Sequence, residues 1–117
     1  MSTKIICVPS DMPGGMSSPV SVNFEDSDVY NYIEISEEGN GSSGISFFSM
    51  RYNCSGVACV DPVDAISKKA SVLIVSKISP SFLHRFLNEG IEVFDRASGT
   101  VSNSVESYVR GELKRLP

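Results

Sequence analysis

The spacing of hydrophobic positions changes along the chain, from strand-like patterns in the first half to alternating strand and helix patterns in the second. Residues 4–8 (KIICV) form a short apolar run, which is typical of a buried strand. Residues 29–36 (VYNYIEIS) alternate between two faces and predict a second strand. A turn-forming stretch at 37–44 separates it from the apolar residues 45–52, so these two strands are expected to form an antiparallel hairpin.

Three helix starts are marked in the second half of the chain. Asp61 with Pro62, and Ser79 with Pro80, each place a capping side chain directly before a proline in the first helical position. Thr100 is the expected cap of a third helix. The inner face of this last helix is predicted to consist of Val101, Val105, Tyr108 and Val109.

Two further strand-like segments, residues 72–75 (VLIV) and 91–94 (IEVF), lie between the predicted helices. The continuous apolar, β-branched run at 72–75 indicates a parallel strand that is buried on both faces, and residues 91–94 predict a last short strand. The resulting order of elements is β β β α β α β α. It predicts one α/β domain over residues 1–117, with a mixed sheet of about five strands and helices on its faces.

Composition limits the classes of function. The 117 residues suffice for one domain, and 41% hydrophobic and 21% charged residues are ordinary for a globular protein. A net charge of −4 argues against binding to nucleic acid or to an anionic membrane. No apolar run approaches the roughly 18 residues of a membrane span, and the apolar run near the N-terminus is too short for an export signal. With three cysteines, an odd number, we expect free thiols and a cytoplasmic protein.

Three segments resemble one known family. They are residues 17–24 (SSPVSVNF), 72–94 (VLIVSKISPSFLHRFLNEGIEVF) and 97–113 (ASGTVSNSVESYVRGEL). In this order they resemble the dinitrogenase iron–molybdenum cofactor biosynthesis family, the NifX-like domains. The resemblance implies a ribonuclease-H-like three-layer fold. It also implies a non-catalytic role in binding or carrying an iron–sulfur or iron–molybdenum cofactor species, with cofactor-assembly proteins as partners.

The chain departs from the family pattern at one place. Where relatives usually have His-Phe-Gly-Arg, this chain has Asn23, Phe24, Glu25 and Asp26. A potential ligand and a cation are thereby replaced by an amide and two carboxylates, which disfavours an anionic cluster nearby. The alternative function is therefore a protein-interaction module that kept the fold and lost metal binding.

Cys54 and Cys59, in the segment NCSGVAC, are the expected cofactor and metal ligands. Thiolates are the usual protein ligands of iron–sulfur clusters, and free N–H groups at the following helix start would lower a thiol pKa. The C-x4-C spacing supplies only half of a four-thiolate set. The alternative is one buried thiol and one loop thiol without a ligand role.

The remaining ligand-type residues have simpler interpretations. Cys7 lies inside the first strand and is expected to be buried. His84, the only histidine, lies on the polar side of its helix, where it is either solvent-exposed or a further metal ligand. The loop at 10–23, with Met12 and Met16, is expected to form a mobile cover over a cleft.

Other functions find less support in the sequence. Residues 98–100 (SGT) either bind an anion at a helix start or simply cap the helix. A ribonuclease-H-like nuclease needs clustered carboxylates for its metals, but the first strand has none, and Asp11 and Glu34 are the nearest. The third strand is expected at a sheet edge, where pairing with a second copy would give a homodimer.

Overall fold

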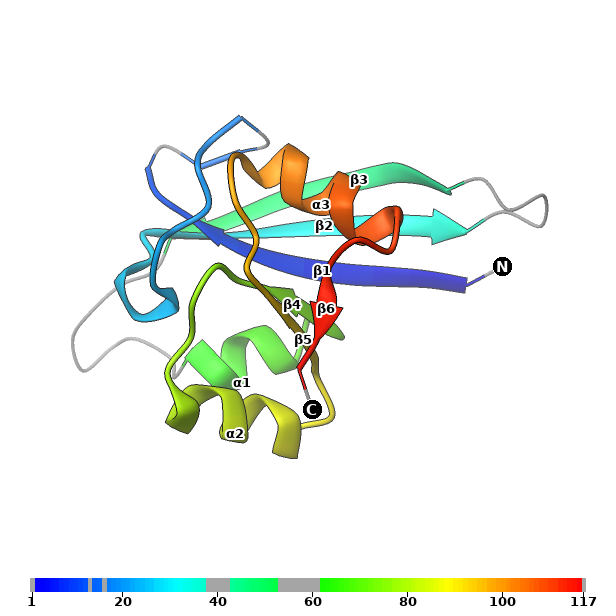
Figure 1. The fold of residues 1–117 in the computed structure, drawn as a ribbon. Helices are drawn as coiled ribbons and strands as arrows, with labels where there is room; N and C mark the ends of the chain where they lie inside the picture. The colour runs from blue at the N-terminus through cyan, green and yellow to red at the C-terminus, as the bar shows by residue number, and fades with distance from the viewer. Residues whose placement is uncertain (1, 13, 16, 38–42, 53–61, 117) are drawn as a thin grey trace.

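The computed structural model describes residues 2–12, 14–15, 17–37, 43–52 and 62–116. Figure 1 shows a sheet with helices on both faces. The strands are β1 Ser2–Ser10, β2 Val29–Glu37, β3 Ser43–Tyr52, β4 Val72–Ile74, β5 Glu92–Asp95 and β6 Lys114–Arg115. The helices are the 3-10 turn η1 Phe24–Asp26 and the α-helices α1 Pro62–Ser67, α2 Pro80–Asn88 and α3 Val101–Val109.

The sheet is mixed, as the sequence predicts. Its strand order is β3-β2-β1-β4-β5-β6. The strands β1, β4 and β5 are parallel to one another, whereas β2, β3 and β6 run antiparallel to their neighbours. The predicted hairpin of the second and third strands is confirmed, and β3 lies at the sheet edge as expected. The two-residue β6 at the opposite edge was not predicted.

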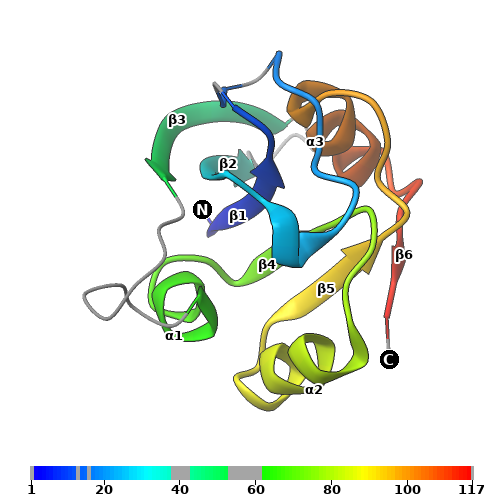
Figure 2. The ribbon, with the colours of Figure 1, turned by 90° about the vertical axis from the view of Figure 1, so that its left-hand side faces the viewer.

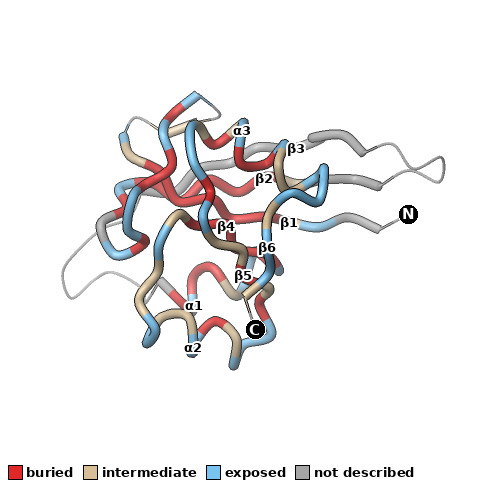
Figure 3. The backbone as a smooth tube through the Cα atoms, in the orientation of Figure 1, coloured by how far each residue is buried: buried red, intermediate tan, exposed pale blue. Residues whose placement is uncertain are grey.

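The sheet buries apolar side chains on both of its faces, so the molecule has three layers (Figures 1 and 2). On one face α1 and α2 cover a cluster that includes Cys7, Leu73 and Phe86. On the other face α3 covers a second cluster that includes Ile6 and Val105. Adjacent residues of the central strand β1 thus belong to different clusters, because successive strand side chains point to opposite faces. Figure 3 shows the buried residues gathered along the middle strands.

Two of the three expected helix caps, Ser79 and Thr100, lie among the described residues, and both are present. The hydroxyl of Ser79 accepts a hydrogen bond from the Phe82 N–H, and that of Thr100 accepts one from the Asn103 N–H. Helix α1 begins at Pro62, as predicted, whereas its proposed cap Asp61 lies outside the described residues.

One face assignment is wrong. The side chain of Val109 was expected on the inner face of α3, yet Val109 is 45% exposed, whereas Val101 and Val105 are buried. Position 109 is eight residues after the first buried position. The 100° turn per residue has by then rotated it past the stripe that faces the sheet. Within the described residues, no helix is long and apolar enough to cross a membrane.

Candidate functional site

The carboxyl ends of the parallel strands meet at one end of the sheet, which we call the loop end. It carries the connections after β1 (residues 11–28), after β4 (75–79) and after β5 (96–100). The same end is reached by Tyr52, the last residue of β3, because Tyr52 and Ser10 both pair with Val29 of β2. Ligands of open α/β sheets bind beyond the carboxyl ends of parallel strands. A binding site is therefore expected at the loop end.

The connection after β1 is fastened by the side chain of Asn31, which is fully buried in β2. Its amide nitrogen donates hydrogen bonds to the Val8 carbonyl at 2.7 Å and to the Ser10 hydroxyl at 2.8 Å. Its amide oxygen accepts one from the Gly15 N–H at 2.9 Å. A buried amide that makes three hydrogen bonds positions a loop firmly.

Backbone hydrogen bonds tie the same connection to its neighbours. The Val20 N–H donates to the Gly99 carbonyl at 2.9 Å, and the Val101 N–H donates to the Ser18 carbonyl at 2.9 Å. The Phe24 N–H donates to the Lys77 carbonyl at 2.9 Å. The described part of this loop is thus bonded to both other connections. This arrangement differs from the loose, mobile cover that the sequence predicts.

The side chain of Phe24 anchors the end of the connection in the core. Phe24 is 2% exposed and stacks on Tyr30 with ring centroids 6.0 Å apart. It meets Phe82 and Phe86 of α2 edge-to-face, at centroid distances of 5.2 Å and 5.4 Å. Such pairs add about 0.5–1.5 kcal/mol each beyond the buried area. This packing places the next residue, Glu25, at the start of α2.

The carboxylate of Glu25 lies against the first turn of α2. Its Oε1 accepts a hydrogen bond from the Ser79 N–H at 2.8 Å. Partial burial acts to raise the pKa of Glu25, but the hydrogen bonds from Ser79 and from the backbone outweigh it, so the pKa lies below its usual value. A negative charge at a helix N-terminus is also favoured by the helix dipole. The chain's own carboxylate thus takes a position that an external anion would otherwise find favourable.

The predicted thiol ligands Cys54 and Cys59 lie outside the described residues. The described residue before this segment, Tyr52, ends β3 at the loop end, and after the segment the chain enters α1 at Pro62. Cys7 is fully buried, as expected, and burial raises the pKa of its thiol far above the ordinary value. Cys7 is therefore an inert core residue.

The other predicted ligand residues are dispersed. His84 is exposed on α2, in agreement with its predicted place on the polar side of that helix. Met12 is 60% exposed, and Met16 lies outside the described part. No three His, Cys, Asp or Glu side chains of the described residues are grouped as a metal site would require. The carboxylate of Asp11 accepts a hydrogen bond from the Ser21 hydroxyl at 3.0 Å.

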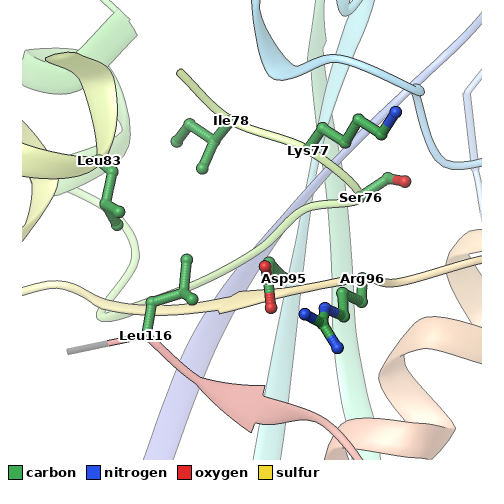
Figure 4. Close-up of a pocket in the computed structure, with 7 residues that line it drawn as sticks. All are labelled: Ser76, Lys77, Ile78, Leu83, Asp95, Arg96 and Leu116. Atoms are coloured by element: carbon green, nitrogen blue, oxygen red, sulfur yellow. The ribbon is translucent and has the colours of Figure 1, made fainter. Parts of the chain in front are cut away.

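A cavity of about 550 Å³ opens beside the connections after β4 and β5 (Figure 4). Its wall consists of Ser76, Lys77, Ile78, Leu83, Asp95, Arg96 and Leu116. The aliphatic side chains gather on one side of the cavity in Figure 4, and the charged ones lie on the other. Sequence reasoning missed this site. The available signal was charged residues at or shortly after the carboxyl ends of two predicted neighbouring strands.

The comparisons with known proteins identify the family. The sequence profile of the family described as dinitrogenase iron–molybdenum cofactor matches residues 4–111. The chain belongs to this family. The resemblance seen in the sequence is thereby confirmed, and membership associates the chain with the biosynthesis or carrying of that cofactor. No curated protein matches the chain.

Solved structures of similar proteins share the fold of this family member. The protein PH0822 superposes with a TM-score of 0.74 at 20% identity, over 96% of each chain. A Methanocaldococcus jannaschii protein, provisionally named a dinitrogenase, gives 0.71 at 17% identity, over 99% of this chain and 97% of its own. The apo form of the orange protein from Desulfovibrio gigas gives 0.68 at 16% identity, over 97% and 92%. At these identities the likeness shows the fold alone.

Proposed function

We propose that this protein transiently binds an iron–sulfur or iron–molybdenum cofactor species and passes it to assembly partners, without catalysing a reaction. The observation that carries the proposal is the family match over residues 4–111. Cys54 and Cys59 are the proposed ligands, since thiolates hold such clusters and Cys7 is buried in the core. Their segment follows directly after Tyr52, which ends β3 at the loop end, and this fold class binds ligands at the carboxyl ends of its strands. A cytoplasmic location agrees with reduced, metal-binding thiols.

The deciding experiment measures iron and sulfide per chain after anaerobic reconstitution. We expect stoichiometric iron in the wild type and its loss in the Cys54→Ser/Cys59→Ser variant. Cys7→Ala is the matched control: it removes the buried thiol, and as long as circular dichroism shows a folded protein it should retain the iron. Wild type and double variant with equally little iron would refute the carrier function.

A second function, a protein-interaction module without metal, is favoured by one specific contact. The Glu25 carboxylate accepts a hydrogen bond from the Ser79 N–H and brings negative charge to the loop end. An anionic cluster would be repelled there. If reconstitution yields no iron, partner capture by an immobilised protein becomes the informative assay.

We also propose that the protein forms a homodimer through β3. This strand has ten residues, and among the described strands it pairs with β2 alone, which makes it an edge strand suited to pairing with a second copy. Pairing of two β3 edges around a two-fold axis would give a continuous sheet. Light scattering over a range of concentrations tests the proposal, and a monomer at the highest concentration would refute it.

A further inference from the structure

The cavity beside β4 and β5 has a composition that the cofactor-carrier function does not use. It holds no thiol, and its volume of about 550 Å³ falls within the roughly 300–1,000 Å³ typical of small-molecule sites. We propose that this cavity binds a small zwitterion with an apolar side chain, that is, an apolar α-amino acid or a short apolar peptide.

The apolar side of the cavity is made by three aliphatic side chains from separate parts of the chain. Ile78 follows β4, Leu83 belongs to α2, and Leu116 follows β6. Each is partly buried and packs against the core cluster under α1 and α2, so each is held in position. The Leu116 N–H donates to the Val93 carbonyl at 2.8 Å, which fixes the C-terminal wall. Such a surface favours an aliphatic group of a ligand.

The polar side carries both signs of charge. Asp95 and Arg96 are neighbours at the end of β5, and Lys77 lies opposite them after β4 (Figure 4). Within the described part of the chain, the ion pairs are Glu106 with Arg110 and Glu92 with Arg115, so none involves these three side chains. The carboxylate of Asp95 is therefore available to a ligand ammonium group, and the guanidinium of Arg96 to a ligand carboxylate.

The backbone of Arg96 adds a second reason to assign a role to its side chain. Its φ is +64°, and it is the non-glycine residue with a positive φ among those described. The conformation is held by the Arg96 N–H, which donates to the Ser76 carbonyl at 3.1 Å, and by the Ala97 N–H, which donates to the Val75 carbonyl at 3.1 Å. Glycine would adopt this conformation without strain. A strained residue with a long charged side chain at a cavity points to a use for that side chain.

Other ligand classes fit the cavity less well. A metal cation would be repelled by Arg96, and a polyanion by Asp95. A purely apolar molecule would leave the Asp95 carboxylate, which is half-buried, without a partner. Only a ligand that carries an ammonium group, a carboxylate and an aliphatic group meets every part of the wall.

Titration of the protein with L-leucine, followed by amide chemical shifts, tests the proposal. We expect saturable shifts at residues 76–78, 95–96 and 116. Three probes each remove one part of leucine: 4-methylpentanoate lacks the ammonium, 3-methylbutylamine lacks the carboxylate, and glycine lacks the side chain. Each should bind at least tenfold more weakly. Leucyl-leucine distinguishes a free amino acid from a peptide as the preferred ligand.

Variants separate a binding role from a structural one. Arg96→Gly and Asp95→Asn should each weaken leucine binding at least tenfold, while both remain folded. Arg110→Gln, which removes an exposed arginine on the other side of the sheet, is the matched control and should bind as the wild type does. The absence of saturable shifts at the cavity, or equal binding of leucine and a truncated probe, would overturn the proposal. None of the lining residues is a proposed iron ligand, so iron content should be the same in these variants as in the wild type, and the result is independent of the carrier function.

Discussion

Replacement of Asn31 by alanine should destabilise the protein and release the loop after β1. The variant removes three hydrogen bonds of 2.7–2.9 Å, made with the Val8 carbonyl, the Ser10 hydroxyl and the Gly15 N–H. Each contributes about 0.5–1.5 kcal/mol net, and a buried group left without a partner costs about 1–3 kcal/mol. Val8 and Ser10 are fully buried, although the Ser10 hydroxyl keeps its hydrogen bond to the Asp11 carbonyl, whereas Gly15 is half-buried and can bond to water instead. We therefore expect a loss of about 3 kcal/mol in the free energy of unfolding.

Urea denaturation and amide hydrogen exchange measure the two consequences separately. The midpoint should fall while the slope stays unchanged, because the surface exposed on unfolding is the same. The Gly15 amide should exchange faster in Asn31→Ala, since its acceptor is gone. Asn88→Ala, at the exposed end of α2, is the matched control and should change neither quantity. A stability loss below about 1 kcal/mol together with an unchanged Gly15 exchange rate would refute the assigned role of Asn31.

Three further substitutions test other contacts of the loop end. Glu25→Gln should lower the free energy of unfolding at neutral pH. Because the folded-state pKa of Glu25 is depressed, the difference from the wild type should fade as the pH falls below the ordinary glutamate pKa of about 4.3. Urea titrations between pH 2 and 7 measure this difference, and a constant difference would contradict the prediction. Arg96→Gly should stabilise the protein by about 1 kcal/mol and raise the midpoint of thermal unfolding, because glycine adopts the positive φ without strain. A lower midpoint would contradict the strain assigned to Arg96. Gly99→Ala should lower the free energy of unfolding, measured in urea, by about 1–2 kcal/mol, because φ is +77° and the new Cβ would lie 2.8 Å from the Asn103 amide nitrogen. Adding Asn103→Ala should recover part of this loss. An unchanged urea midpoint in the single variant would contradict the prediction.

Features encoded by neighbouring residues were predictable from the sequence. The caps Ser79 and Thr100 lie next to the helices they begin, and the apolar run at 72–75 needs no distant information to be recognised as a buried strand. The mixed sheet follows from the order of these elements. By contrast, β6 consists of Lys114 and Arg115, two exposed residues without an apolar pattern, so nothing local distinguishes it from a loop.

The loop end was harder to predict because its contacts join distant residues. Glu25 and Ser79 are 54 positions apart, and Asn31 reaches Gly15 and Val8 from another strand. The side chain of Asn31 did leave a trace in the sequence, as the one amide on an otherwise apolar strand face. The cavity depends on the pairing of β5 with β6, which brings Leu116 near Leu83. Tertiary pairing of this kind cannot be deduced from local spacing.

The central position of β1 has a consequence for how the chain folds. Its antiparallel partner β2 follows after one connection, but its parallel partner β4 lies much further along the chain, with Ile6 opposite Val72. Closing the longer loop costs more chain entropy and gives slower folding. The β1–β2–β3 meander is thus expected to form early, and the docking of β4 onto β1 should limit the folding rate. Replacement of Leu73, which lies in β4, by alanine should then slow folding. Replacement of Val105 by alanine should mainly accelerate unfolding, because Val105 lies in α3 and α3 docks after this step.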